Sequence, residues 1–124
     1  MKLARIGNPG KEKPIIVDKD NNYRDVSSVI KDFNSDNLNF ETLEKLNKIK
    51  TEDLPILEKN QRIGACVNKP SKFIGIGLNF KDHAIEQNMP IPKEPIIFSK
   101  FTNSVSGPND DIEIPKNSNH TDWE

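Results

Sequence analysis

Two groups of side chains have the types and the spacing that chemistry requires. The first is His83 with Glu86, three residues apart in segment 82–87, which we interpret as a short helical turn. That spacing places both side chains on one face of a helix, within hydrogen-bonding reach. A carboxylate that orients an imidazole and raises its basicity makes a general base. An ordinary pair of polar side chains at a solvated helix end has the same spacing, so both interpretations stay open on spacing alone.

The second group consists of His120, Asp122 and Glu124 at the C-terminal end. On a strand, residues two apart share a face, so all three side chains would point the same way. Carboxylates suit Mg²⁺ or Ca²⁺, and an imidazole favours transition metals. A solvated polar terminus is the alternative. A metal-binding strand needs a second ligand two residues beyond Glu124, so we expect the chain to be the front part of a larger enzyme.

Three further residue patterns carry less information. Lys100 follows an apolar segment, and it could hold a substrate carboxylate or lie on the surface as an ordinary lysine. The Gly75-x-Gly77 pair lacks the third glycine of a dinucleotide-binding fingerprint. Cys66 is the only cysteine, so no disulfide can form within the chain and we expect a reducing compartment. It has no neighbouring base, so we expect a small buried side chain and not a catalytic thiol.

Composition excludes two classes of partner. The formal net charge is −1, which provides no basic footprint for nucleic acid and no cationic face for an anionic membrane. Residues 1–7 contain no continuous apolar stretch, so we expect no signal peptide, no membrane span and a cytoplasmic location. Apolar residues make up only 33% of the sequence, which is lean for a self-sufficient core.

The first half of the chain predicts short strands and one helix. Strands flank a turn at 7–10, and an Asx-rich turn at 18–22 joins two β-prone runs in a hairpin. Apolar residues recur at helical spacing over 40–50, with Asn39 as the expected N-cap. A further short strand is expected near 62–64.

The second half predicts β-structure. We expect an apolar strand over 73–78, a buried strand over 95–98, a turn at 106–110 and an alternating strand over 111–115. The two glycines of the first of these strands indicate close approach by another group. The fold class is therefore α+β and mostly β. We expect a small N-terminal domain over 1–68, and the beginning of a catalytic β-domain over 69–124.

Taken together, four segments resemble the fumarylacetoacetate hydrolase family in order and spacing. They are Lys72-Phe73-Ile74-Gly75-Ile76-Gly77-Leu78-Asn79-Phe80-Lys81-Asp82-His83-Ala84-Ile85-Glu86, Pro95-Ile96-Ile97-Phe98-Ser99-Lys100, Ser104-Val105-Ser106-Gly107-Pro108-Asn109-Asp110 and Thr121-Asp122-Trp123-Glu124. The opening of the chain also resembles the leading domain of one branch of that family. That branch includes proteins labelled ureidoglycolate lyase, 2-hydroxyhepta-2,4-diene-1,7-dioate isomerase and diketo-sugar-acid hydrolases.

The resemblance implies a fold and roles for individual residues. It implies a small N-terminal domain followed by the start of a mixed β-sheet roll, usually a homodimer, with Mg²⁺ or Mn²⁺ as cofactor. His83 and Glu86 would be the water-activating dyad, Lys100 would contact substrate, and Glu124 would be the first glutamate of the metal strand. A second glutamate and a later aspartate of the family are absent. Phe80 stands where tyrosine is common, so a hydrogen bond from that hydroxyl is lost.

The function implied is cleavage or isomerisation of 2-keto or β-diketo acids through a metal-chelated enolate, by a C–C hydrolase, lyase or isomerase. The family does not name the substrate. The alternative is a catalytically incomplete fragment that serves only as a binding or dimerisation module. An unpaired strand edge near 111–124 predicts poor solubility or oligomers for the isolated chain.

Overall fold

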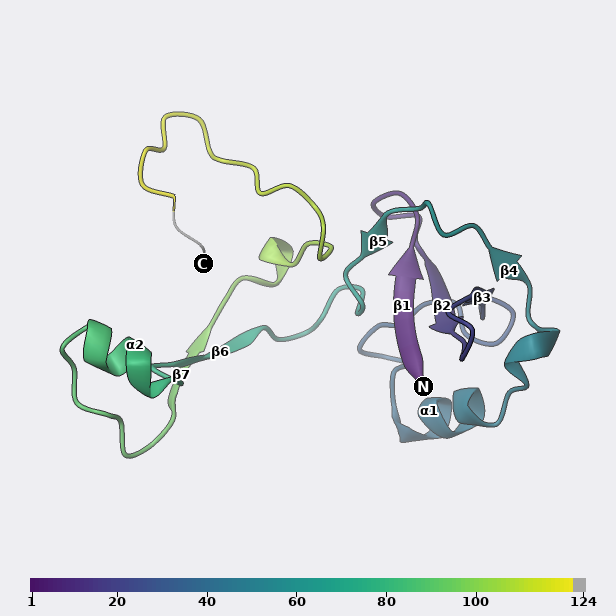
Figure 1. Ribbon diagram of the computed structural model, residues 1–124, viewed down its shortest axis with the longest axis horizontal. Helices are drawn as coiled ribbons and strands as arrows, with labels where there is room; N and C mark the ends of the chain where they lie inside the picture. Colours follow the sequence, from purple (N-terminus) through teal and green to yellow (C-terminus); the bar gives the residue numbers. More distant parts are fainter. Residues whose placement is uncertain (122–124) are drawn as a thin grey trace.

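A computed structural model describes residues 1–121 and shows a mostly β chain with antiparallel sheets (Figure 1). The larger sheet has five strands in the order β4-β3-β2-β1-β5, and every neighbouring pair is antiparallel. Its strands are β1 (Lys2–Ile6), β2 (Lys13–Val17), β3 (Tyr23–Asp25), β4 (Ile56–Leu57) and β5 (Ile63–Gly64). The predicted mostly β class is confirmed at this level.

Local turn chemistry explains the two hairpins of this sheet. Gly7 and Gly10 have φ values of 123° and 75°, a region that favours glycine, and they bound the predicted turn between β1 and β2. Between β2 and β3, the Asp18 carboxylate accepts hydrogen bonds from the backbone N–H groups of Asp20 and Asn22 at 2.9 and 2.8 Å. Both predicted turns are therefore confirmed.

Helix α1 (Phe40–Asn47) packs on the five-stranded sheet through Leu46, which is buried. Asn39 is the N-cap as predicted, since its side-chain oxygen accepts a hydrogen bond from the Thr42 backbone N–H at 2.9 Å. The helix ends earlier than predicted, at the C-cap Lys48, and is followed by the 3₁₀ turn η1 (Thr51–Asp53). Leu46 belongs to a buried core that also contains Ile16, Val26, Ile30 and Phe33.

The second sheet is a two-stranded ribbon that extends away from the first (Figure 1). Strands β6 (Ile74–Gly77) and β7 (Ile96–Ser99) pair antiparallel, and α2 (Lys81–Glu86) lies in the connection between them. The 3₁₀ turn η2 (Thr102–Ser104) follows β7. Gly75 faces the ring of Phe98 so closely that a Cβ would collide with it, which confirms the predicted close approach at these glycines.

Three expectations are wrong. Strand β7 is exposed rather than buried, because no described segment covers the ribbon: Ile97 is 68% exposed. Residues 111–115 form no strand, because no partner strand lies beside them within residues 1–121. Cys66 is exposed, because it lies in the connection between the two sheets and not beneath either.

Within residues 1–121, the helices are all too short and too polar to cross a lipid bilayer.

Candidate functional site

Helix α2 carries the two residues whose spacing fits either a general base or an ordinary polar pair at a solvated helix end. His83 and Glu86 lie in the same six-residue helix and are both exposed, so the predicted helical turn is confirmed. Ala84 is fully buried, which identifies the face by which α2 packs. The helix ends at Gln87, whose backbone N–H donates to the His83 carbonyl at 3.0 Å. Both side chains are described, and neither a hydrogen bond nor an ion pair joins them.

Lys100 lies at the opposite end of the ribbon. Its backbone N–H donates to the Phe73 carbonyl at 2.8 Å, and its Nζ lies 5.9 Å from the centre of the Phe98 ring. The register pairs Ile74 with Ser99 at this end, and Gly77 with Ile96 at the α2 end. At about 3.3 Å per residue, the paired segment separates the two ends by roughly 10 Å. The structure therefore does not bring Lys100 and His83 into one cluster.

A shallow depression of about 330 Å³ adjoins Lys100. Its lining includes Phe73 and Phe98 together with the polar groups of Ser71 and Thr102. An ammonium beside an apolar surface can hold the carboxylate of a small acid, which is one of the two roles that the sequence left open for Lys100.

The predicted metal ligand, Glu124, lies outside the described residues, as does Asp122. His120, the remaining member of that triple, is exposed and belongs to no strand. Residues 1–121 contain no group of three histidine, cysteine, aspartate or glutamate side chains that could hold a metal ion. The described part of the chain thus supplies no metal centre of its own.

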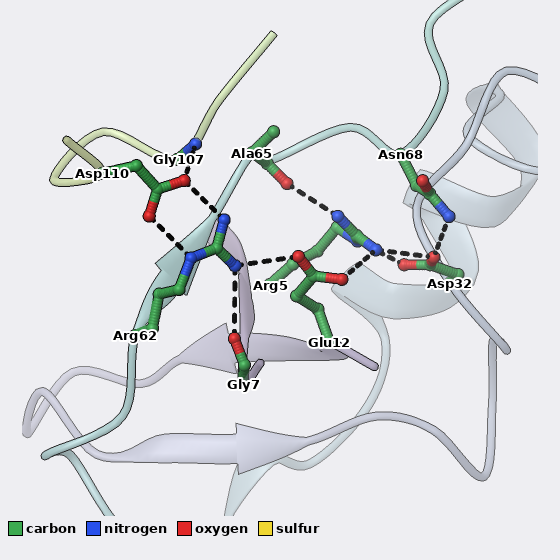
Figure 2. Close-up of polar contacts among 9 residues, drawn as sticks. All are labelled: Arg5, Gly7, Glu12, Asp32, Arg62, Ala65, Asn68, Gly107 and Asp110. Carbon is green, nitrogen blue, oxygen red and sulfur yellow. Dashed lines mark hydrogen bonds and ion pairs between the residues drawn. The ribbon is translucent and has the colours of Figure 1, made fainter. Parts of the chain in front are cut away.

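The densest polar cluster was not anticipated from the sequence (Figure 2). Arg62 donates from Nε and Nη2 to the two carboxylate oxygens of Asp110 at 2.6 and 2.5 Å. Its Nη1 donates to Glu12 at 2.9 Å and to the Gly7 carbonyl at 3.2 Å. Two parallel N–H···O bonds make the Arg62–Asp110 contact bidentate, the strongest geometry for this kind of pair.

Glu12 connects this contact to a second arginine. Arg5, only 4% exposed, donates to Glu12 at 3.3 Å and to both oxygens of Asp32 at 2.5 and 2.9 Å. Asn68 also donates to Asp32, at 2.7 Å. Positive and negative groups alternate from Asp110 to Asp32, so each buried charge faces an opposite one.

The pKa values of two carboxylates in the cluster, Asp110 and Glu12, are depressed. The Arg62 guanidinium, followed by the Gly107 backbone N–H, holds the pKa of Asp110 below its usual range. Burial opposes ionisation of Glu12, but hydrogen bonds from backbone groups and Arg62 and the charge of Arg5 together lower its pKa. The same two carboxylates raise the pKa of Arg62. Asp110, Glu12 and Arg62 are therefore ionised and paired at neutral pH, and neither carboxylate is free to act as a base.

The residues of the cluster come from distant parts of the chain. Arg62 and Asp110 are separated by 48 positions, and Arg5 and Asp32 by 27. No spacing rule within one element relates such residues, so sequence reasoning gave no signal for the cluster. The one available hint was Arg5 itself, a charged residue between the apolar Ala4 and Ile6 of β1.

Comparison with known proteins matches both halves of the chain to longer proteins. Residues 72–124 match the family model described as Fumarylacetoacetate (FAA) hydrolase C-terminal. The whole chain is 52% identical over 124 residues to a protein of Burkholderia multivorans and to one of Burkholderia ambifaria, each carrying the name "putative hydrolase". A Burkholderia cenocepacia protein of the same name is 51% identical. The chain spans 44% of the length of each of these relatives.

Proposed function

We propose that this chain is the amino-terminal part of an enzyme of the fumarylacetoacetate hydrolase family, acting on 2-keto or β-diketo acids. The observation that carries the proposal is the match of residues 72–124 to the family's C-terminal domain. The name "putative hydrolase" of relatives that match all 124 residues supports the same reaction class. The proposal includes a small domain over 1–68, the start of a mixed β-sheet roll over 69–124, a cytoplasmic location and a homodimer.

His83 and Glu86 are the residues that we assign to proton transfer. Their exposure on α2 gives water free access to the imidazole. Their spacing of three residues places the carboxylate within reach of the imidazole, so a side-chain rotation would bring the two into a hydrogen bond. In the hydrolytic reaction, His83 takes a proton from a water molecule as the water oxygen attacks the distal carbonyl of the substrate. The C3–C4 bond then breaks, and its electron pair moves into the enolate of the departing 2-keto acid. Lyase and isomerase reactions use a related enolate, so the exact reaction is left open.

A divalent ion, Mg²⁺ or Mn²⁺, belongs to this proposal through the sequence resemblance. Such an ion supplies Lewis-acid stabilisation of developing negative charge. The described residues gather no ligand set for it, and its proposed ligand Glu124 lies outside them. No step of the reaction is therefore assigned to the metal.

The test uses a protein of the relatives' full length that contains these 124 residues. We expect cleavage of a β-diketo acid, found by screening a panel, to fall about 10²- to 10⁴-fold in kcat for His83→Asn, since a general base contributes about that much. The matched control is Asp82→Asn, a neighbouring exposed acid on the same helix, which should keep its rate. A fully active His83→Asn enzyme would exclude the assigned base, and turnover in excess EDTA would exclude the metal.

A second candidate, a catalytically incomplete module that serves only for binding or dimerisation, is favoured for residues 1–124 on their own by two observations. The ribbon holds His83 and Lys100 at opposite ends, and the described residues offer no metal ligand set. The same screen, run on residues 1–124 alone, separates the two candidates. Turnover by the shorter chain supports a complete site, and its absence together with activity of the longer protein supports the incomplete one.

A further inference from the structure

The contact between the turn Gly107–Asp110 and strand β5 joins the two halves of the described chain. The turn follows β7 and η2 in the sequence, and β5 is an edge strand of the five-stranded sheet. Figure 2 shows the Asp110 carboxylate facing the Arg62 guanidinium across this junction. The two residues lie in segments that the chain connects only through the exposed ribbon.

The carboxylate of Asp110 has two tasks in the turn. Its Oδ2 accepts a hydrogen bond from the Gly107 backbone N–H at 2.6 Å, and the Asp110 backbone N–H donates back to the Gly107 carbonyl at 3.2 Å. The same oxygen accepts from Arg62. A single side chain therefore closes the turn and binds it to the neighbouring sheet.

Gly107 fits the junction because it has no side chain. It is buried, and a Cβ at this position would collide with the backbone carbonyl of Ile63 in β5. A backbone carbonyl within a strand cannot move aside as a flexible side chain can. The turn thus lies directly against the strand, and the contact combines close backbone packing with a bidentate ion pair.

Arg62 is itself held in place from the other side. Its Nη1 binds Glu12 and the Gly7 carbonyl, and Glu12 is only 7% exposed and also paired with Arg5. These contacts fix the guanidinium relative to β1 and to the turn between β1 and β2. Since its orientation is set by the sheet, the position of Asp110 is set by the sheet as well.

We propose that Arg62 anchors the Gly107–Asp110 turn to the edge of the amino-terminal sheet. This contact fixes where the chain leaves the sheet before residues 111–121. This inference goes beyond the proposed function, because it depends on contacts among described residues and on no reaction or metal.

Amide hydrogen exchange, followed by nuclear magnetic resonance on the 124-residue chain, tests the proposal. We expect Arg62→Gln to speed exchange of the Gly107 N–H at least about tenfold, because the carboxylate that binds this N–H loses its fixed partner. Amides of the β1–β2 ladder should keep their protection. In Arg62→Lys, the Gly107 exchange rate should lie between those of the unchanged protein and Arg62→Gln, since an ammonium binds one carboxylate oxygen and cannot form the bidentate pair.

The matched control is Arg24→Gln, which removes another arginine paired with an aspartate of the same sheet. Arg24 donates to Asp18 at 2.8 Å and touches no residue of the turn. It should leave Gly107 exchange unchanged. Unchanged Gly107 exchange in Arg62→Gln, or an equal rise in both variants, would overturn the proposal. Should Arg62→Gln fail to fold, Asp110→Asn provides the same readout from the turn side, and intact Gly107 protection there would likewise overturn it.

Discussion

At the scale of single residues, the ionisation of Asp18 makes the stability of the five-stranded sheet depend on pH. The Arg24 guanidinium first of all, with hydrogen bonds from Asn22 and Asp20, lowers the pKa of Asp18 to about 2 from an ordinary value of 3.8. A carboxyl group whose pKa is lower in the folded than in the unfolded state stabilises the fold fully when the pH is above its unfolded-state pKa. That contribution is lost as the pH falls through its folded-state pKa. We therefore expect stability from this pair to be constant above about pH 5 and to decline between about pH 4 and 2.

Urea unfolding at a series of pH values measures this contribution. In Asp18→Asn the side chain no longer titrates, so the free energy of unfolding should fall less steeply between pH 4 and 2 than in the unchanged protein. The difference between the two proteins should be largest near neutral pH and shrink with acid. A difference that stays constant down to pH 2 would contradict the assigned pKa.

Candidate functional residues could be predicted from the sequence only where they lie close together along the chain. His83 and Glu86 stand out because both lie within one helical turn, and α2 does place them on one helix. Arg62 and Asp110 could not be found, because their contact depends on the path of the intervening chain and not on any spacing. The exposure of Cys66 was missed for the same reason, since burial is decided by what packs above a residue.

At the scale of elements, the N-cap of α1 is a measurable source of stability. Asn39→Ala removes the oxygen that accepts the Thr42 N–H, and we expect a loss of about 0.5–2 kcal/mol in the free energy of unfolding. The matched control is Asn47→Ala at the other end of the same helix, where the side chain is exposed and alanine is the better helix former. Equal losses for both variants, measured by urea unfolding, would show that the cap has no specific role.

Elements were predicted well where their signals are contained within a few residues. The turn at 18–22 carries its own carboxylate acceptor, and α1 carries its own cap, so neither depends on distant contacts. The strand expected over 111–115 failed because alternation states only that a segment could be half buried in a sheet. Without a partner strand among the described residues, the backbone there forms no ladder.

At the scale of the whole molecule, the ribbon of β6 and β7 presents apolar side chains on both faces. The register places Ile76 opposite Ile97 on one face and Phe98 opposite Gly75 on the other. These three large side chains are 42%, 68% and 38% exposed in that order. Two-stranded ribbons are marginal in water, and apolar surface of this extent on a monomer favours association. Among residues 1–121, both strands also have an unpaired edge that a second chain can extend.

We therefore expect residues 1–124 to self-associate as concentration rises. The sequence analysis expected an unpaired strand edge near 111–124 to cause this association, whereas we now expect the ribbon to cause it. Sedimentation equilibrium should give an average mass that increases with concentration. Ile97→Lys should shift the chain toward monomer, because a charge on this face opposes both burial and edge pairing. The control is Phe40→Lys, which removes an even more exposed apolar side chain on α1, away from the ribbon, and should not change association. If the chain stays monomeric at high concentration, the exposed apolar side chains of the ribbon do not drive association, and the ribbon needs no partner.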